Sequence, residues 1–297
     1  MPTSDDYYQS GKELFDFAWN VVTELLTTFD EAEYYGIDPN EVSDAYWKAA
    51  RRSITTALSV TQQGVEFLIK GKIAQISPYI LVSDNPRNWP TPYGRNCIEF
   101  SEFRTLDAQD LIRTHDTFSD DIFSDEFVDR FNSLRDQRNK LMHSVDKNTE
   151  VSVAQLVDAI LYMHKALLPM ESWPKIRLEF LRQSPTSEFG SWEVAINRVS
   201  WETELAIKHL TPKQVKSYFN IDKKQRAYFC PECLCGADTN AGFEEKLARL
   251  TSKGGSANEL YCPICDNKFT VTRENCESES CLGNVISEDG TCLTCGG

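Results

Sequence analysis

The chain has 297 residues, 41% of them hydrophobic and 26% charged, so it can bury a core and does not have the composition of a disordered protein. Its formal net charge of −14 disfavours broad, non-specific nucleic-acid binding, because an acidic surface repels polyanions at long range. We see neither a secretory leader nor an apolar run long enough to span a membrane. We therefore expect a cytoplasmic protein without a membrane partner, whose ten cysteines do not form disulfides.

The first part of the chain predicts long helices. Apolar residues recur with helical spacing over residues 12–29, and Gly36 and Pro39 end this pattern. Asn40 is a suitable N-cap for a second, long helix that continues to about Ile76, where a Ser-Pro pair ends it. These two segments predict a pair of long helices joined by a short connection.

A loop is predicted over residues 83–97 from its content of proline, asparagine and glycine. After it, the periodicity predicts helices over residues 108–115, 125–143, 153–168, 176–182, 192–209 and 212–219. Long helices with short connections are typical of an antiparallel helical bundle. The fold class predicted is therefore mainly α, with a small cysteine-rich domain at the end of the chain.

Composition changes abruptly near residue 222, and nine of the ten cysteines lie between Cys230 and Cys295. We therefore predict a helical domain over residues 1–221 and a zinc-ribbon domain over 222–297. Within the second domain, residues 242–253 predict a short helix between cysteine pairs.

Four cysteine pairs predict two metal sites. A two-residue gap places two thiolates on one tight turn, and two such turns complete a tetrahedral zinc site. Sites made of four cysteines leave no open position for water, so we expect two structural zinc ions and no catalytic metal. The predicted ligands are Cys230, Cys233, Cys262 and Cys265 for one ion, and Cys276, Cys281, Cys292 and Cys295 for the other.

Two details of these sites are open in the sequence. Cys235 is a spare thiol that could replace Cys233 in another register, and the pairs could instead be disulfides or free thiols. Gly236 and Gly296 suit turns that need a positive φ.

The tail holds eight Lys and Arg against twelve Asp and Glu between residues 222 and 297. A protein partner is thus at least as compatible with the ribbon as a nucleic acid.

A second motif lies in the helix predicted over residues 125–143. Arg138 is followed by Asn139, and four residues separate Arg138 from His143. This string resembles the R-x(4–6)-H motif of HEPN-domain ribonucleases, which lies late in an antiparallel bundle and near the end of a helix. The resemblance covers about residues 10–170, and residues 171–221 have no counterpart in it.

The long second helix carries Glu66 and Lys70, which are similar to an E-x3-K element of some HEPN members. Read without the resemblance, they are a surface pair one turn apart. The resemblance implies that Glu66 and Lys70 support the site.

The residues of the motif suit RNA cleavage by the 2′-hydroxyl of the RNA itself. On a helix, Arg135, Asn139 and His143 share one stripe, and Arg138 lies on the next. His143 would transfer a proton, and Arg138 would bind the phosphate and stabilise the transition state. Asn139 would orient His143 or contact the phosphate, and Lys140 would anchor the strand.

One histidine does not readily serve as base and acid together, and in HEPN enzymes two subunits combine their motifs. The resemblance therefore implies an RNA substrate, a homodimer, and a toxin or antiviral defence role. The alternative is an inactive HEPN scaffold in which Arg138 and His143 make structural contacts and the ribbon binds a partner.

Overall fold

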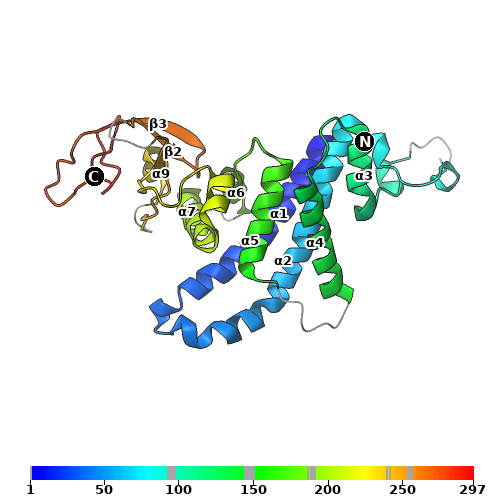
Figure 1. Cartoon of the computed structure of the whole chain (residues 1–297), viewed down its shortest axis with the longest axis horizontal. Coiled ribbons are helices and arrows are strands. Elements are labelled where there is room, and N and C mark those ends of the chain that lie inside the picture. Colours follow the sequence, from blue (N-terminus) through cyan, green and yellow to red (C-terminus); the bar gives the residue numbers. More distant parts are fainter. Residues whose placement is uncertain are drawn as a thin grey trace. The chain divides into compact units, whose positions relative to one another are not determined.

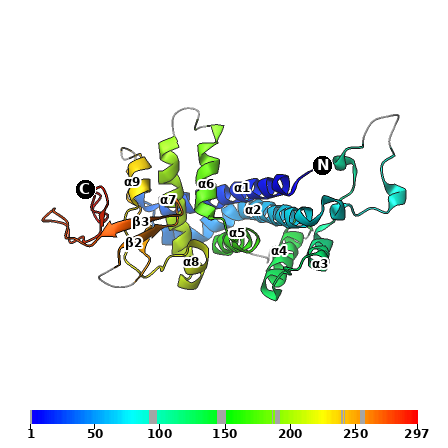
Figure 2. The same ribbon diagram turned by 90° about the horizontal axis from the view of Figure 1, so that it is seen from above.

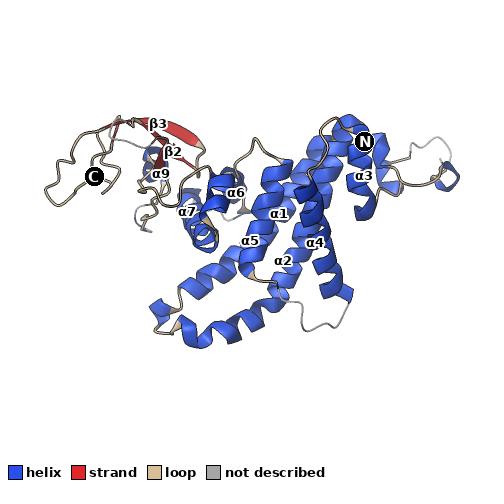
Figure 3. Ribbon diagram, in the orientation of Figure 1, coloured by secondary structure: helices blue, strands red, loops and turns tan. Residues whose placement is uncertain are grey.

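The computed structural model describes residues 2–91, 98–143, 151–185, 187, 192–238, 240, 242–252 and 257–297, apart from the side chains of residues 142, 143, 192 and 193. The chain forms two compact units, Met1–Leu167 and Leu168–Gly297. The structure is mainly helical, and its named strands all belong to the second unit (Figure 3).

Two long antiparallel helices form the frame of the first unit, α1 (Ser4–Asp30) and α2 (Pro39–Ile76) (Figures 1 and 2). α1 begins earlier than the apolar stripe predicts, because Thr3 and Asp6 form a capping box ahead of it. α2 is capped by Asp38 rather than by the predicted Asn40, whose backbone N–H donates to the Asp38 carboxylate at 2.9 Å. Polar residues close to a helix start determine its first residue more than periodicity does.

Three further helices pack on this frame. α3 (Ala108–Phe118) and α4 (Asp125–His143) contact α2, and α5 (Val153–Leu167) contacts α1, α2 and α4. Their apolar faces meet in one core. Fully buried side chains of that core include Phe15, Trp19, Leu58, Leu68, Phe127, Phe131 and Leu111. Burial of these faces confirms the predicted helical bundle.

The chain between α2 and α3 has little regular structure where it is described. Short 3-10 helices form over Pro78–Leu81, Pro86–Asn88 and Phe100–Glu102. Ser83 N–H donates to the Arg104 carbonyl at 3.0 Å, and this hydrogen bond joins the two ends of the segment between α2 and α3. As a result, the N-terminus of α3 is brought next to α2.

The second unit joins helices to a small sheet. Its helices are α6 (Trp173–Arg182), α7 (Trp192–His209), α8 (Pro212–Phe219) and the short α9 (Pro231–Gly236). Its strands are β1 (Arg249–Leu250), β2 (Glu259–Cys262), β3 (Asn267–Thr272) and β4 (Ile286–Ser287), antiparallel in the order β1-β2-β3-β4.

The change in composition near residue 222 lies inside the second unit, not between the two units. Hydrogen bonds cross it: the Asn197 amide donates to the Asp238 carbonyl at 2.9 Å, and Lys223 Nζ donates to the Ile207 carbonyl at 2.7 Å. Helices α6 to α8 and the cysteine-rich segment therefore form one compact body, although their compositions differ.

Two local predictions for the tail are wrong. Residues 242–253 are not a helix where they are described: 242–247 are irregular, Ala248 forms an antiparallel bridge with Tyr228, and Arg249 pairs with Tyr261 in the sheet. Long-range strand pairing overrides the helical tendency of this segment. Gly236 is not at a positive φ; it ends α9, where an added Cβ would lie 2.8 Å from Ile196 Cδ1. Gly296 does have the predicted positive φ, at 85°.

Candidate functional site

The four cysteines of the first group come from the N-terminal part of α9 and from the hairpin between β2 and β3. Cys230 caps α9, and the Cys233 backbone N–H points at its Sγ at 3.5 Å. Cys262 ends β2, and Cys265 lies in the turn before β3. The Sγ atoms of Cys230 and Cys265 lie 3.6 Å apart, and those of Cys233 and Cys262 lie 3.8 Å apart. All four thiols are buried.

The second group comes from the last segment of the chain. Sγ of Cys276 lies 3.8 Å from that of Cys295, and Cys281 lies 3.9 Å from Cys292. An added Cβ at Gly283 would lie 2.7 Å from the Cys292 sulfur, so a larger residue would displace that thiol. In each group all four sulfurs lie within 4.8 Å of one another.

These spacings fit a metal centre. Four sulfurs at about 2.3 Å from one zinc ion, in a tetrahedron, are about 3.8 Å from each other. A disulfide would require about 2.05 Å, and the described cysteines are free. The eight cysteines form the two predicted groups of four, and each group could hold one metal ion. Cys233, not Cys235, belongs to the first group, and Cys235 is exposed.

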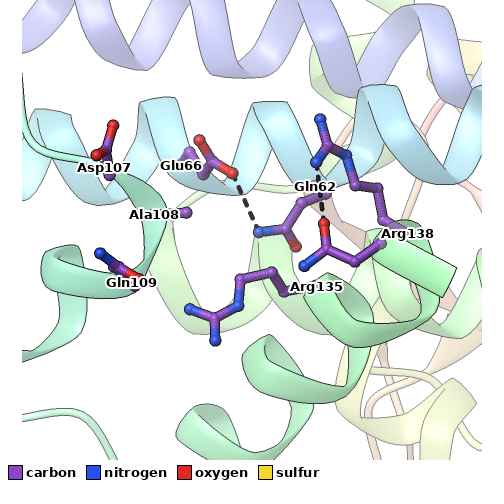
Figure 4. Close-up of a pocket in the computed structure, with 8 residues that line it drawn as sticks. Gln62, Glu66, Asp107, Ala108, Gln109, Arg135 and Arg138 are labelled. Carbon is purple, nitrogen blue, oxygen red and sulfur yellow. Dashed lines mark hydrogen bonds between the residues drawn. The ribbon is translucent and has the colours of Figure 1, made fainter. Parts of the chain in front are cut away.

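A pocket in the first unit brings Glu66 together with Arg138 and Asn139 of the Arg-x4-His string. The pocket measures about 290 Å³ and is formed by α2, α4 and the start of α3 (Figure 4). Its lining residues are Gln62, Glu66, Asp107, Ala108, Gln109, Arg135, Arg138 and Asn139. Glu66 and Arg138, which are 72 positions apart in the sequence, thus face the same space.

Two hydrogen bonds order this pocket. Arg138 Nη1 donates to the Asn139 side-chain oxygen at 3.0 Å, and Gln62 Nε2 donates to Glu66 Oε1 at 3.3 Å. Arg135 and Arg138 are half-buried, and both line the pocket. A neighbouring hollow of about 440 Å³ shares Gln62, Glu66 and Arg138 with it.

The other predicted site residues lie elsewhere. Lys70 Nζ donates to Thr105 Oγ1 at 3.1 Å, does not line the pocket, and has a pKa that burial lowers. Lys140 is exposed on α4. His143 is the last residue of α4, but its side chain lies outside the described residues, so its distance to Arg138 is not defined.

Sequence reasoning missed three polar residues of the pocket. The sequence does indicate Gln62 as a candidate, since it precedes Glu66 by one helical turn and therefore lies on the same face of the helix. No sequence feature indicates Asp107 and Gln109, because only the path of the chain after α2 brings them to the pocket.

The chain matches no protein-family description, no curated protein and no solved structure in our comparisons. In the part of the chain that the structure describes, no helix is both long enough and apolar enough to cross a membrane.

Proposed function

We propose that the protein is a metal-independent endoribonuclease of HEPN type, with Arg138, Asn139 and His143 as its catalytic residues. The observation that carries this proposal is the shared pocket of Glu66 and Arg138. A chance Arg-x4-His string does not require Glu66, the acidic residue of the E-x3-K element, to lie beside its arginine. The pocket also places two guanidinium groups, those of Arg135 and Arg138, where they can bind a phosphate, and the carboxylates of Glu66 and Asp107 in the same lining offset their charge.

The reaction would proceed by attack of the 2′-hydroxyl oxygen on the adjacent phosphorus. A bond between the 2′-oxygen and phosphorus forms, and the bond from phosphorus to the 5′-oxygen breaks. His143 takes the 2′-hydroxyl proton, and a second acid protonates the leaving 5′-oxygen. Arg138 stabilises the charge on the phosphoryl oxygens with its two-pronged geometry. The products are a 2′,3′-cyclic phosphate and a 5′-hydroxyl.

A homodimer would supply the second acid as His143 of the other chain. Asn139 accepts a hydrogen bond from the Arg138 guanidinium at 3.0 Å, which restricts the orientation of the arginine within its own chain. By the same resemblance, we propose a toxin or antiviral defence effector in the cytoplasm. Light scattering on the full chain should give a mass of two subunits. A monomer at micromolar concentration would exclude the composite site.

We further propose zinc as the metal of both cysteine groups. Soft thiolate ligands in a tetrahedral set of four select zinc or iron–sulfur centres, and a colourless protein would favour zinc. Each ion would be structural, because four thiolates fill its coordination sphere. The second unit would then be a targeting or assembly module.

An inactive scaffold remains a second candidate, favoured by one observation. The net charge of −14 opposes RNA binding outside a local cationic site. In this second reading Arg138 serves to hold Asn139 within α4, and the second unit binds a protein partner.

Incubation of the full-length protein with total RNA, with excess EDTA added only at the start of a short assay so that structural metal is retained, separates the two candidates. We expect cleavage with cyclic phosphate ends, no cleavage by His143→Ala, and greatly reduced cleavage by Arg138→Lys, which lacks the fork. Arg52→Lys is the matched control, because it makes the same substitution at an exposed position of α2 that lines neither hollow. Full activity of His143→Ala, or strict dependence on added magnesium, would contradict the enzyme proposal.

A further inference from the structure

We propose that Gln62 is a substrate-positioning residue whose amide oxygen accepts a hydrogen bond from the nucleotide held by Arg138. This inference rests on the proposed function and adds a residue that neither motif contains. The shared chemistry is an O–H or N–H donor of the nucleotide, supplied by the ribose 2′-hydroxyl or by the base.

The first observation is an unpartnered buried acceptor. Gln62 is 2% exposed, and within the described part of the chain its Oε1 receives no hydrogen bond. A buried oxygen without a donor is unfavourable, and buried polar groups that are not satisfied call for an explanation. A ligand that donates to this oxygen would remove the deficit.

The second observation is that the orientation of the amide is determined. A carboxylate only accepts hydrogen bonds, so Glu66 must face the amide nitrogen of Gln62 rather than its oxygen. The Nε2 to Oε1 distance is 3.3 Å. Figure 4 shows the Gln62 nitrogen turned to Glu66 and the oxygen turned away from it. Glu66 thereby acts on the substrate through Gln62.

The third observation concerns charge and space. Gln62 and Arg138 both line the 290 Å³ pocket and the 440 Å³ hollow beside it. A phosphate bound by Arg138 would therefore bring its own ribose and base next to Gln62. Arg135 adds a second cation on the same helix, whereas Glu66 and Asp107 line the pocket as acceptors. This combination suits a ligand with one anionic end and one donor-bearing end.

The test measures binding by full-length protein carrying His143→Ala, which prevents cleavage. The probes are fluorescent ten-nucleotide oligouridylate, oligoadenylate and oligocytidylate, each in ribose and 2′-deoxyribose form, followed by anisotropy. Gln62→Met removes the acceptor but keeps the length and helical tendency of the side chain. Thermal unfolding of each variant verifies that the fold is retained.

Gln9→Met is the matched control. Gln9 donates to Glu13 at 3.0 Å with the same one-turn spacing, but it is exposed on α1 and outside the pocket. We expect this variant to bind every probe as the parent does. If it weakens binding as much as Gln62→Met, the effect is not specific to the pocket and the proposal fails.

A loss of about tenfold in affinity is expected when Gln62→Met meets a probe that carries the donor. Loss with the ribose probes alone identifies the 2′-hydroxyl, and equal loss in both sugar forms of one base identifies the base. Uniform loss over all six probes, or no loss, would overturn the role of Gln62 while leaving the ribonuclease proposal intact. Absence of binding by the parent protein would instead overturn both.

Discussion

Gly11 of α1 and Gly64 of α2 face each other where the two long helices cross. A Cβ added at Gly11 would lie 3.0 Å from the Gly64 carbonyl oxygen, and one added at Gly64 would lie 3.1 Å from the Gly11 carbonyl oxygen. Neighbouring side chains also fill this space: a Cβ added at Gly64 would lie 2.6 Å from a Phe15 ring carbon, and one added at Gly11 would lie 2.6 Å from Leu68 Cδ2. The helices can approach this closely only because neither glycine has a side chain.

Replacement of Gly64 by alanine should therefore destabilise the protein. In an exposed helix the same change stabilises by about 1 kcal/mol, because glycine is a poor helix former. Here the added methyl group meets backbone and an aromatic ring, and overpacking costs typically about 1–3 kcal/mol. Urea unfolding of Gly64→Ala should show a lower midpoint. A higher midpoint would mean that the crossing relaxes freely.

A buried ion pair in the second unit predicts an asymmetric mutational effect. Arg177 and Glu202 are both 3% exposed and form two hydrogen bonds of 2.9 Å, and Arg198 donates to the same carboxylate at 2.8 Å. Removal of one partner leaves the other charge buried, which costs about 3–5 kcal/mol. Glu202→Gln should thus lower the stability strongly. The double variant Arg177→Met with Glu202→Met should recover most of that loss in thermal unfolding.

The pH dependence of stability should include a contribution from His164 of α5. Burial lowers the pKa of His164 to about 3, with Lys12 and Lys165 adding to the shift. Below pH 6.5 the unfolded chain binds a proton at this residue and the folded chain does not, so stability is lost as the pH falls. The loss from this group is about 2 kcal/mol between pH 7 and pH 5.

His164→Gln removes this titration, so comparison with the parent isolates it from the carboxylates. The measured quantity is the unfolding free energy of both proteins at pH 7 and pH 5. The variant should lose less stability than the parent over that interval. Equal losses would show that His164 is protonated in the folded state.

Removal of metal should unfold the cysteine-rich segment and spare the first unit. Structural zinc contributes on the order of 10–16 kcal/mol of binding free energy in zinc-finger peptides, so the sheet is not expected to survive a strong chelator. Elemental analysis should give two ions per chain, and circular dichroism should retain most helical signal after chelation. Cys262→Ser should lose one ion, whereas Cys235→Ser, outside both groups, should keep two.

The features that the sequence predicts well depend on neighbours within a few residues. The periods of apolar residues predict α4 and α7 over the ranges in which the structure describes them, and Thr211 with Pro212 predicts the start of α8. The spacing of the cysteine pairs predicts the two four-cysteine groups, because each tight turn is a local structure.

Other features depend on segments that are distant in the sequence. Pairing with β2 makes Arg249 and Leu250 a strand, although the residues before them favour a helix. The fold of the tail, not its spacing, selects Cys233 over Cys235. Likewise, the helical register of α2 against α4 brings Gln62 to Arg138.

The sequence by itself therefore determined the helices of the bundle, the cysteine pairs and the two halves of the candidate motif, since local spacing specifies each of them. Only the tertiary structure decided that Glu66 and Arg138 share a pocket and that Gln62 is buried within it. The physical reason is that such contacts arise when helices bury apolar faces against one another, and this packing is not encoded in any single short segment.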